Sequence, residues 1–255
     1  MTILELDVGN TRIKWRRILE NGSKVLSEGV SLNESEFASE QANFEKPKMM
    51  RFCNVRGEGI TQRILDWSQK HWNLDPVVAR VRRECGGVKI NYPDVSCLGV
   101  DRWLAMLSAF KKSKGACIVV DSGTAFTLDV LNAEGVHLGG YILPGLELMK
   151  KDLIANTNIS LDTNVAESSI RLGNSTDEAV LNGSSAALVA LIHQSISNLL
   201  ALDLQLSVFF SGGDGKKLMT LTDFAGSRSE ASLVLDGLAI GCPDDKQRCE
   251  VENWG

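Results

Sequence analysis

The same short pattern occurs twice in this chain, each time where an apolar strand is expected to end. Residues 3–6 lead into Asp7-Val8-Gly9-Asn10-Thr11, and residues 116–120 lead into Asp121-Ser122-Gly123-Thr124-Ala125. Alternating and continuous apolar runs predict strands at residues 2–8 and 116–120. The repeat is far longer than the roughly 20–50 residues of a solenoid unit, so it indicates two duplicated domains.

The elements expected after each copy follow a matching order. In the first half, periodicity and turn signals predict strands at 12–19, 24–30, 49–55 and 76–79 and helices at 33–44 and 60–72. In the second half they predict strands at 126–131, 136–143, 206–210 and 232–235 and helices at 146–154, 176–202, after Asp214 and at 237–242. A helix at 102–112 joins the halves, so we expect an α/β protein with domains at 1–114 and 115–255.

Composition narrows the class of protein. The net charge of −5 argues against a nucleic-acid partner, and the absence of a run of about 18 apolar residues or of a signal peptide predicts no membrane association. The six cysteines show no C-x-x-C spacing and are expected to be reduced thiols of a cytoplasmic protein. The three histidines form no zinc-ligand pattern with them.

Each D-x-G loop can serve as half of a phosphate clamp. Glycine lets backbone N–H groups approach anionic oxygens, Thr11, Ser122 and Thr124 offer hydroxyl donors, and Lys14 can reach a terminal phosphate. The aspartates would repel phosphate unless Mg²⁺ or a monovalent ion lies between them. The alternative interpretation of a single D-x-G loop is an ordinary hairpin turn.

Three further segments are expected to border the same site. Ser211-Gly212-Gly213-Asp214 separates a strand from a helix and suits a base or ribose, although an ordinary turn explains it equally well. Residues 139–145, GGYILPG, also end a strand and begin a helix. In Gly99-Val100-Asp101-Arg102, Asp101 can accept a proton from an attacking hydroxyl and Arg102 can bind a carboxylate or phosphate; otherwise they are a helix cap and a surface ion pair.

In combination these motifs resemble the type III pantothenate kinase family. The matching stretches are DVGNTRIKW at 7–15, GVDRW at 99–103, VDSGTAFTLD at 120–129, GGYILPG at 139–145, the glycine, threonine and alanine pattern from Gly173 to Gly183, and SGGD at 211–214. Single motifs are shared across the acetate and sugar kinase, heat-shock chaperone and actin superfamily, whereas the combination with G-x-D-R is more specific.

The resemblance implies two ribonuclease-H-like (actin-like ATPase) domains with an ATP cleft between them. It implies transfer of the ATP γ-phosphoryl group to pantothenate, giving 4′-phosphopantothenate in the first step of coenzyme A biosynthesis. ATP would be bound by Asp7, Val8, Gly9, Asn10, Thr11, Arg12, Ile13, Lys14 and Thr124. Asp101 would be the catalytic proton acceptor, and pantothenate would contact Tyr92, Gly99, Val100, Asp101, Arg102 and Thr176.

The resemblance also implies that Asp121 binds a monovalent cation, K⁺ or NH₄⁺, and that the protein is a homodimer. The chain departs from the family pattern at Ser211, where a threonine is expected, and at Phe126, where the family more often has threonine; the spacing from Tyr92 to Gly99 also varies in the family. Two alternatives stay open: another small-molecule kinase of the same superfamily, and a regulatory protein that keeps the fold without turnover.

Overall fold

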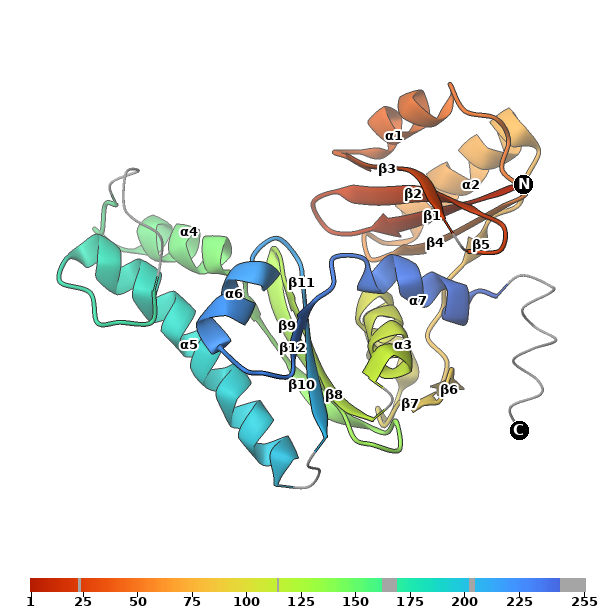
Figure 1. Cartoon of the computed structure of the whole chain (residues 1–255). Coiled ribbons are helices and arrows are strands. Elements are labelled where there is room, and N and C mark those ends of the chain that lie inside the picture. Colours follow the sequence, from red (N-terminus) through yellow and green to blue (C-terminus); the bar gives the residue numbers. More distant parts are fainter. Residues whose placement is uncertain (23, 114, 162–168, 202–204, 244–255) are drawn as a thin grey trace. The chain divides into compact units, whose positions relative to one another are not determined.

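The computed structural model describes residues 1–22, 24–113, 115–161, 169–201 and 205–243. Within it the chain divides into two compact units (Figure 1). Unit 1 comprises residues 1–108 and the described residues from 233 onward, and unit 2 comprises residues 109–232. We describe each unit by itself.

Unit 1 is built on a five-stranded sheet with the order β3-β2-β1-β4-β5. Its strands are β1 (Thr2–Val8), β2 (Ile13–Leu19), β3 (Val25–Ser31), β4 (Met49–Asn54) and β5 (Val77–Val78). β1, β2 and β3 are antiparallel, whereas β4 and β5 run parallel to β1. Leu4, Leu6 and Val8 alternate along β1 onto the face that packs against α1 (Glu34–Gln41) and α2 (Glu58–Trp72).

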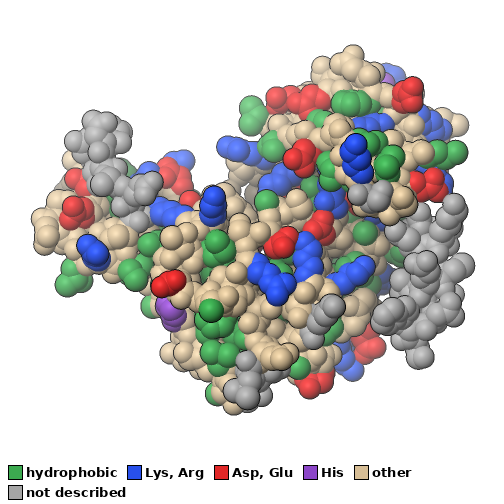
Figure 2. Space-filling model, viewed as in Figure 1, with side chains coloured by type: hydrophobic (Ala, Val, Ile, Leu, Met, Phe, Trp, Pro, Cys, Tyr) green, Lys and Arg blue, Asp and Glu red, His purple; other side chains and the backbone are tan. Residues whose placement is uncertain are grey.

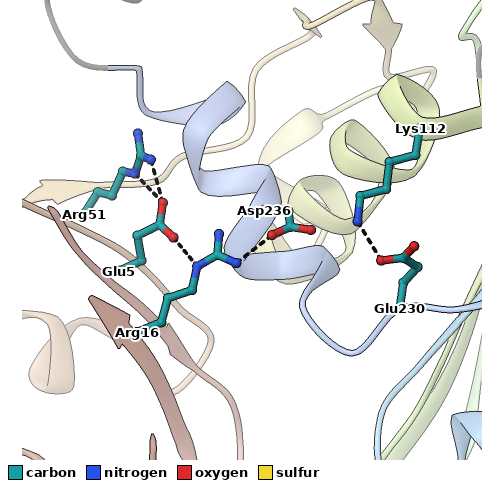
Figure 3. A network of polar contacts seen from close by, with 6 residues as sticks. All are labelled: Glu5, Arg16, Arg51, Lys112, Glu230 and Asp236. Atoms are coloured by element: carbon teal, nitrogen blue, oxygen red, sulfur yellow. Dashed lines mark hydrogen bonds and ion pairs between the residues drawn. The ribbon is translucent and has the colours of Figure 1, made fainter. Parts of the chain in front are cut away.

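The opposite face of this sheet carries buried charge (Figure 3). Glu5 on β1 pairs in register with Arg16 on β2 and Arg51 on β4. Its carboxylate accepts from Arg16 Nε at 2.5 Å and from Arg51 Nε at 2.8 Å. Arg16 also binds Asp236 of α7 (Leu233–Gly241) at 2.6 Å, and Arg51 donates to the carbonyl of Cys242 at 2.9 Å. These ion pairs and hydrogen bonds fasten α7 to the sheet of unit 1.

Unit 2 repeats this topology. Its sheet has the order β10-β9-β8-β11-β12, with strands β8 (Ala116–Ser122), β9 (Ala125–Leu131), β10 (His137–Pro144), β11 (Leu206–Ser211) and β12 (Ser227–Ser229). Its helices are α4 (Leu146–Asn156), α5 (Thr176–Leu200) and α6 (Gly215–Thr222). Ile118, Val120 and Leu128 pack in one core with Leu188 and Ile192 of α5. The predicted repeat of strand and helix order is therefore confirmed.

α5 is long and apolar enough, by length and composition, to cross a membrane, a test that core helices of globular proteins also pass. Thirty-nine per cent of its most apolar window is buried inside the structure. The buried face, which includes Leu188, Ile192 and Ile196, belongs to the core of unit 2.

One predicted strand is wrong. Residues 232–235 were expected to form a strand, but α7 begins at Leu233, and the last parallel strand is β12. A side chain at Gly237 would overlap the backbone of Leu104, so glycine allows α7 to pack closely on α3 (Val100–Ser113). This glycine weakens the helical signal in the sequence, which explains the error.

Unit 1 contains two elements that were not predicted. They are the two-stranded hairpin of β6 (Glu84–Cys85) and β7 (Val88–Lys89) and the 3₁₀ helix η1 (Val95–Cys97). The predicted domain boundary between residues 114 and 115 lies within unit 2, and α7 belongs to unit 1 because of the contacts described above. The domain assignment itself stays a prediction.

Cys53, Cys85, Cys97, Cys117 and Cys242 are free thiols, and Cys249 lies outside the described residues.

Candidate functional site

The first D-x-G loop joins β1 to β2. Residues 9–12 connect the two antiparallel strands, with Gly9 half-buried and Asn10, Thr11 and Arg12 exposed. From the end of the neighbouring strand β4, Arg56 donates its Nε hydrogen to the carbonyl of Gly9. A Cβ at position 9 would lie 3.5 Å from the carbonyl of Arg12, which is an ordinary contact distance. The hydrogen bond from Arg56 thus fixes the start of the loop, and residues 10–12 are exposed to solvent.

Asp7 lies at the centre of a polar row across three strands. In the ladder it is opposite Lys14 on β2 and Cys53 on β4, so the three side chains share one face of the sheet. The Asp7 carboxylate is 8% exposed, and its Oδ1 lies 3.5 Å from Sγ of Cys53, which donates to it. The row brings together a carboxylate, an amine and a thiol at the carboxyl end of β1.

Asp101 belongs to the same neighbourhood. Burial and the negative charges of Asp7 and Asp101 raise the pKa of the Cys53 thiol well above its usual value. Cys53 is therefore a neutral donor toward Asp7 at physiological pH. Asp7 contacts this thiol directly, and the negative charge of Asp101 acts on the same thiol.

The G-x-D-R motif has a steric explanation. Asp101 lies in the first turn of α3, and its Oδ1 accepts from the backbone N–H of Arg102 at 2.8 Å. A Cβ at Gly99 would lie 2.7 Å from that Oδ1, so a larger residue there would displace the carboxylate from this position. Arg102, which is 8% exposed, places Nη1 at 3.5 Å from the hydroxyl of Tyr92. Unit 1 thus brings together four of the predicted residues: Asp7, Tyr92, Asp101 and Arg102.

The second D-x-G loop joins β8 to β9 in unit 2. Asp121 ends the buried part of β8 and is half-buried, whereas Thr124 is exposed in the loop. The Ser122 side chain is buried, so its hydroxyl does not offer the exposed phosphate donor that was expected of it.

Two other predicted loops pack directly on this one. Gly145 donates its N–H to the carbonyl of Thr124 at 2.9 Å, and a Cβ at Gly145 would overlap the carbonyl oxygen of Gly123. Gly212 has φ of +83°, and a Cβ there would overlap the backbone of Ser122. Asp214 donates its N–H to the carbonyl of Ser122 at 3.0 Å. The segments GGYILPG and SGGD therefore meet the second D-x-G loop, and their role at the ligand site stays a prediction.

Thr176 begins α5 and is exposed. Ser175 caps the helix by accepting from the N–H of Glu178, whose side chain accepts from the N–H of Asn174. This pair of hydrogen bonds differs from a capping box, because Glu178 bonds Asn174 instead of the cap residue Ser175. A side chain at Gly173 would overlap the backbone of the first turn of α5, so this glycine fixes where the preceding loop meets Thr176.

The donor set suits hard cations. Magnesium is commonly held by one or two carboxylates together with water and substrate phosphates, and Asp7 and Asp101 provide two carboxylates in one neighbourhood. The residues that the structure describes contain no cluster of three or more histidine, cysteine or acidic side chains that would form a complete metal cage. A cation here would thus depend on oxygens from water or from a bound nucleotide.

Arg56 is a site residue that the sequence analysis did not identify. Its Nη2 is buried, with no hydrogen-bond partner among the described residues, and the same guanidinium holds Gly9 of the first loop. The signal that would have found it is positional: Arg56 follows β4 and so lies at the same sheet edge as the loop after the parallel strand β1.

On the face drawn in Figure 2, acidic and basic side chains are intermingled over the described residues. Among the described residues, that face therefore shows no large area of one charge, which would attract oppositely charged ligands over long distances.

Comparison with known proteins relates this site to a family. The profile described as type III pantothenate kinase matches residues 3–198. The type III pantothenate kinase of Pseudomonas fluorescens is 36% identical over 254 residues, which cover 94% of this chain and 99% of that protein. The enzyme of the same name from Pseudomonas putida is 37% identical over 250 residues, covering 95% of this chain and 100% of that protein.

Solved structures show the same fold. A Campylobacter jejuni protein assigned to the Baf family of transcriptional activators aligns with a TM-score of 0.62 and 23% identity, covering 98% of this chain and 99% of that one. The ROK hexokinase of Thermus thermophilus aligns with a TM-score of 0.51 and 12% identity, covering 94% and 97%. These likenesses confirm the predicted α/β fold with two sheet domains. The profile match and the full-length relatives establish that the chain belongs to the type III pantothenate kinase family.

Proposed function

We propose that this chain transfers the γ-phosphoryl group of ATP to the primary hydroxyl of pantothenate, giving 4′-phosphopantothenate in the first step of coenzyme A biosynthesis. Family membership supports the reaction. The observation that carries the proposal is the start of α3, where Asp101 precedes Arg102 and Arg102 Nη1 lies 3.5 Å from the Tyr92 hydroxyl. That arrangement supports a proton acceptor next to groups that can bind an alcohol substrate, which phosphoryl transfer requires.

ATP is assigned to the D-x-G loops. Asp7, Val8, Gly9, Asn10, Thr11, Arg12, Ile13 and Lys14 form the first phosphate-binding segment, and Thr124 contributes from the second. The exposed backbone of residues 9–12 and the Lys14 side chain beside Asp7 support this role. Asp7 would hold Mg²⁺, which neutralises the charge on the phosphates when it is bound.

Asp101 accepts the proton of the attacking hydroxyl. Gly99 and Val100 shape the turn before it, Arg102 and Tyr92 bind the polar groups of pantothenate, and Thr176 provides a further contact. The distance of 3.5 Å between Arg102 Nη1 and the Tyr92 hydroxyl supports a shared substrate site, because Arg102 directly follows Asp101 in the sequence. Most of the rate enhancement would come from positioning the reactants, since this transition state requires little covalent chemistry from the protein.

A monovalent cation, K⁺ or NH₄⁺, is assigned to Asp121. A half-buried carboxylate at a strand end offers the oxygen donors that hard cations prefer, and the adjoining loop adds backbone carbonyls. We also propose a homodimer located in the cytoplasm. The free thiols of the described residues agree with a reducing compartment.

The test is ADP release by purified protein with ATP, Mg²⁺ and pantothenate, measured in K⁺ and again in Na⁺ alone. We expect release that requires pantothenate and increases with K⁺, and a matched Asp101→Asn protein that binds ATP without turnover. ATP binding without pantothenate-dependent release would overturn the proposed acceptor. The same assay with other primary alcohols and sugars would then identify which acceptor the site prefers.

A further inference from the structure

Arg83, an exposed arginine of unit 1, donates hydrogen bonds to the segment that contains Tyr92. Arg83 immediately precedes the hairpin of β6 and β7 (Figure 1). Its Nη1 donates to the carbonyls of Ile90 at 3.2 Å and of Tyr92 at 2.8 Å. Its Nη2 donates to the carbonyl of Pro93 at 3.0 Å, and its own carbonyl accepts from the N–H of Ile90 at 2.8 Å. The Arg83 side chain therefore satisfies three backbone carbonyls of the segment that leaves the hairpin, and its backbone carbonyl helps to close the hairpin.

Little of this segment is buried. Ile90 and Leu98 are buried and anchor its two ends, whereas the residues between them are exposed or half-buried. Hydrophobic packing therefore contributes little to the position of Tyr92. A planar guanidinium that donates several hydrogen bonds in fixed directions can supply the missing constraint, which a flexible ammonium cannot reproduce.

The constraint continues toward the proton acceptor. Asp94 follows Pro93 and caps η1, accepting from the N–H of Ser96 at 2.9 Å and from its hydroxyl at 2.7 Å. These hydrogen bonds, with a smaller contribution from the positive charge of Arg83, lower the pKa of Asp94, so the cap stays ionised at neutral pH. η1 then leads to Gly99 and Asp101. The hydrogen bonds of Arg83 and Asp94 thus order the chain from residue 90 to η1, which precedes the G-x-D-R motif.

We propose that Arg83 is a positioning residue for the acceptor substrate: it holds the backbone of residues 90–93 so that the Tyr92 hydroxyl lies against Arg102 beside Asp101. The inference rests on the proposed function for the identity of the acceptor, pantothenate. It assigns Arg83 no contact with the substrate. It predicts that the binding of the acceptor depends on the fork geometry of Arg83, while the binding of ATP does not.

The kinetic test compares Arg83→Lys and Arg83→Gln with the control Arg80→Gln. Arg80 is also exposed and lies three residues earlier in the chain. Loss of hydrogen bonds from a charged group should raise the KM for pantothenate about tenfold in both Arg83 variants and leave the KM for ATP within about twofold. The control should behave as wild type. Equal increases in both KM values, or wild-type values in both Arg83 variants, would overturn the proposal.

A spectroscopic test separates positioning from a general loss of structure. The chain contains two tyrosines, Tyr92 and Tyr141, so protein labelled with 3-fluorotyrosine gives two ¹⁹F signals, which Tyr141→Phe assigns. Arg83→Lys and Arg83→Gln should move the Tyr92 signal toward that of an exposed tyrosine and leave the Tyr141 signal unchanged. An unmoved Tyr92 signal in both variants would refute the role of Arg83 even if activity fell.

This measurement needs no substrate, so the inference and the proposed function can fail separately. If wild-type protein shows no pantothenate-dependent ADP release, the proposed acceptor is wrong, while the ¹⁹F comparison still decides whether Arg83 positions Tyr92. If wild-type protein is active and the Arg83 variants match it in both KM values and spectra, only the positioning role is wrong. Arg83→Lys provides the conservative variant should Arg83→Gln fail to fold.

Discussion

The two sheets share one topology but bury different chemistry at the same place. Two residues before the loop aspartate, β1 carries Glu5 and β8 carries Val119. Glu5 lies between Arg16 and Arg51 in the ladder, whereas Val119 lies between Asp129 and Phe209. In unit 2 the Asp129 carboxylate is instead paired with His137, at 2.9 Å from Nε2. The duplicated backbone therefore does not require its buried charges, and each unit has its own arrangement.

The two D-x-G loops also differ in the contacts that hold them in place. The first D-x-G loop is held from outside by the Arg56 side chain, with an ordinary contact distance around Gly9. The second loop is held by close backbone packing, which only glycine permits at positions 145 and 212. One loop depends on a side-chain donor and the other on the absence of side chains. The substitutions below test this difference, beginning with the largest expected effect.

Asp101→Asn tests whether the chemistry depends on unit 1. Loss of the proton acceptor should reduce kcat about 10²- to 10⁴-fold, while ATP still binds. ADP release and calorimetric ATP binding measure the two properties. A variant with unchanged turnover would remove Asp101 as the base and would leave the G-x-D-R motif with only a structural role.

Glu5→Gln tests the buried ion pairs that Glu5 makes with Arg16 and Arg51 in unit 1. Removing the carboxylate leaves two buried arginines without their shared partner, so the free energy of unfolding should fall by about 3–5 kcal/mol. The matched change in unit 2, Val119→Ala, should cost about 1–3 kcal/mol. Urea unfolding followed by circular dichroism compares them. If Glu5→Gln lowered the free energy of unfolding no more than Val119→Ala, the buried ion pairs of Glu5 would contribute no more to stability than the apolar side chain at the matching position of unit 2.

Gly145→Ala and Gly9→Ala compare the two loops directly. The new methyl group at position 145 overlaps the carbonyl oxygen of Gly123, so we expect a loss of about 1–3 kcal/mol. At position 9 the methyl group meets only the carbonyl of Arg12 at 3.5 Å, so stability should change by less than about 0.5 kcal/mol. Thermal unfolding measures both variants. Similar losses in the two proteins would contradict the proposed difference in how the loops are held.

Asp121→Ala tests the cation assigned to unit 2 and should have the smallest effect on basal turnover. Stimulation by K⁺ should largely disappear, because the carboxylate proposed to bind the ion is gone, while the rate in Na⁺ alone should change little. A K⁺ titration of ADP release measures this, with Glu134→Ala, an exposed carboxylate of the same unit, as control. A K⁺ response equal to that of wild type would exclude Asp121 as the ligand.

The sequence predicted what depends on local patterns. Strand alternation and the two D-x-G copies were enough for the repeated topology, and the predicted starts of the helices at residues 33 and 176 lie within one residue of the starts of α1 and α5. The ion pair between Arg16 and Asp236 could not be predicted, because 220 residues separate its members. The β6–β7 hairpin has strands too short to produce a periodic signal. Arg56 and Arg83 act through backbone carbonyls, whose positions depend on the folded chain.

The attachment of α7 to the first sheet has a consequence for synthesis. The strands of unit 1 leave the ribosome early, but the helix that supplies Asp236 and the carbonyl of Cys242 comes after all of unit 2. Domains generally fold in the order in which they emerge, so we expect unit 2 to be complete while Arg16 and Arg51 still face water. In a released chain that is truncated after residue 232, proteolysis should therefore cut the first sheet readily and spare the second.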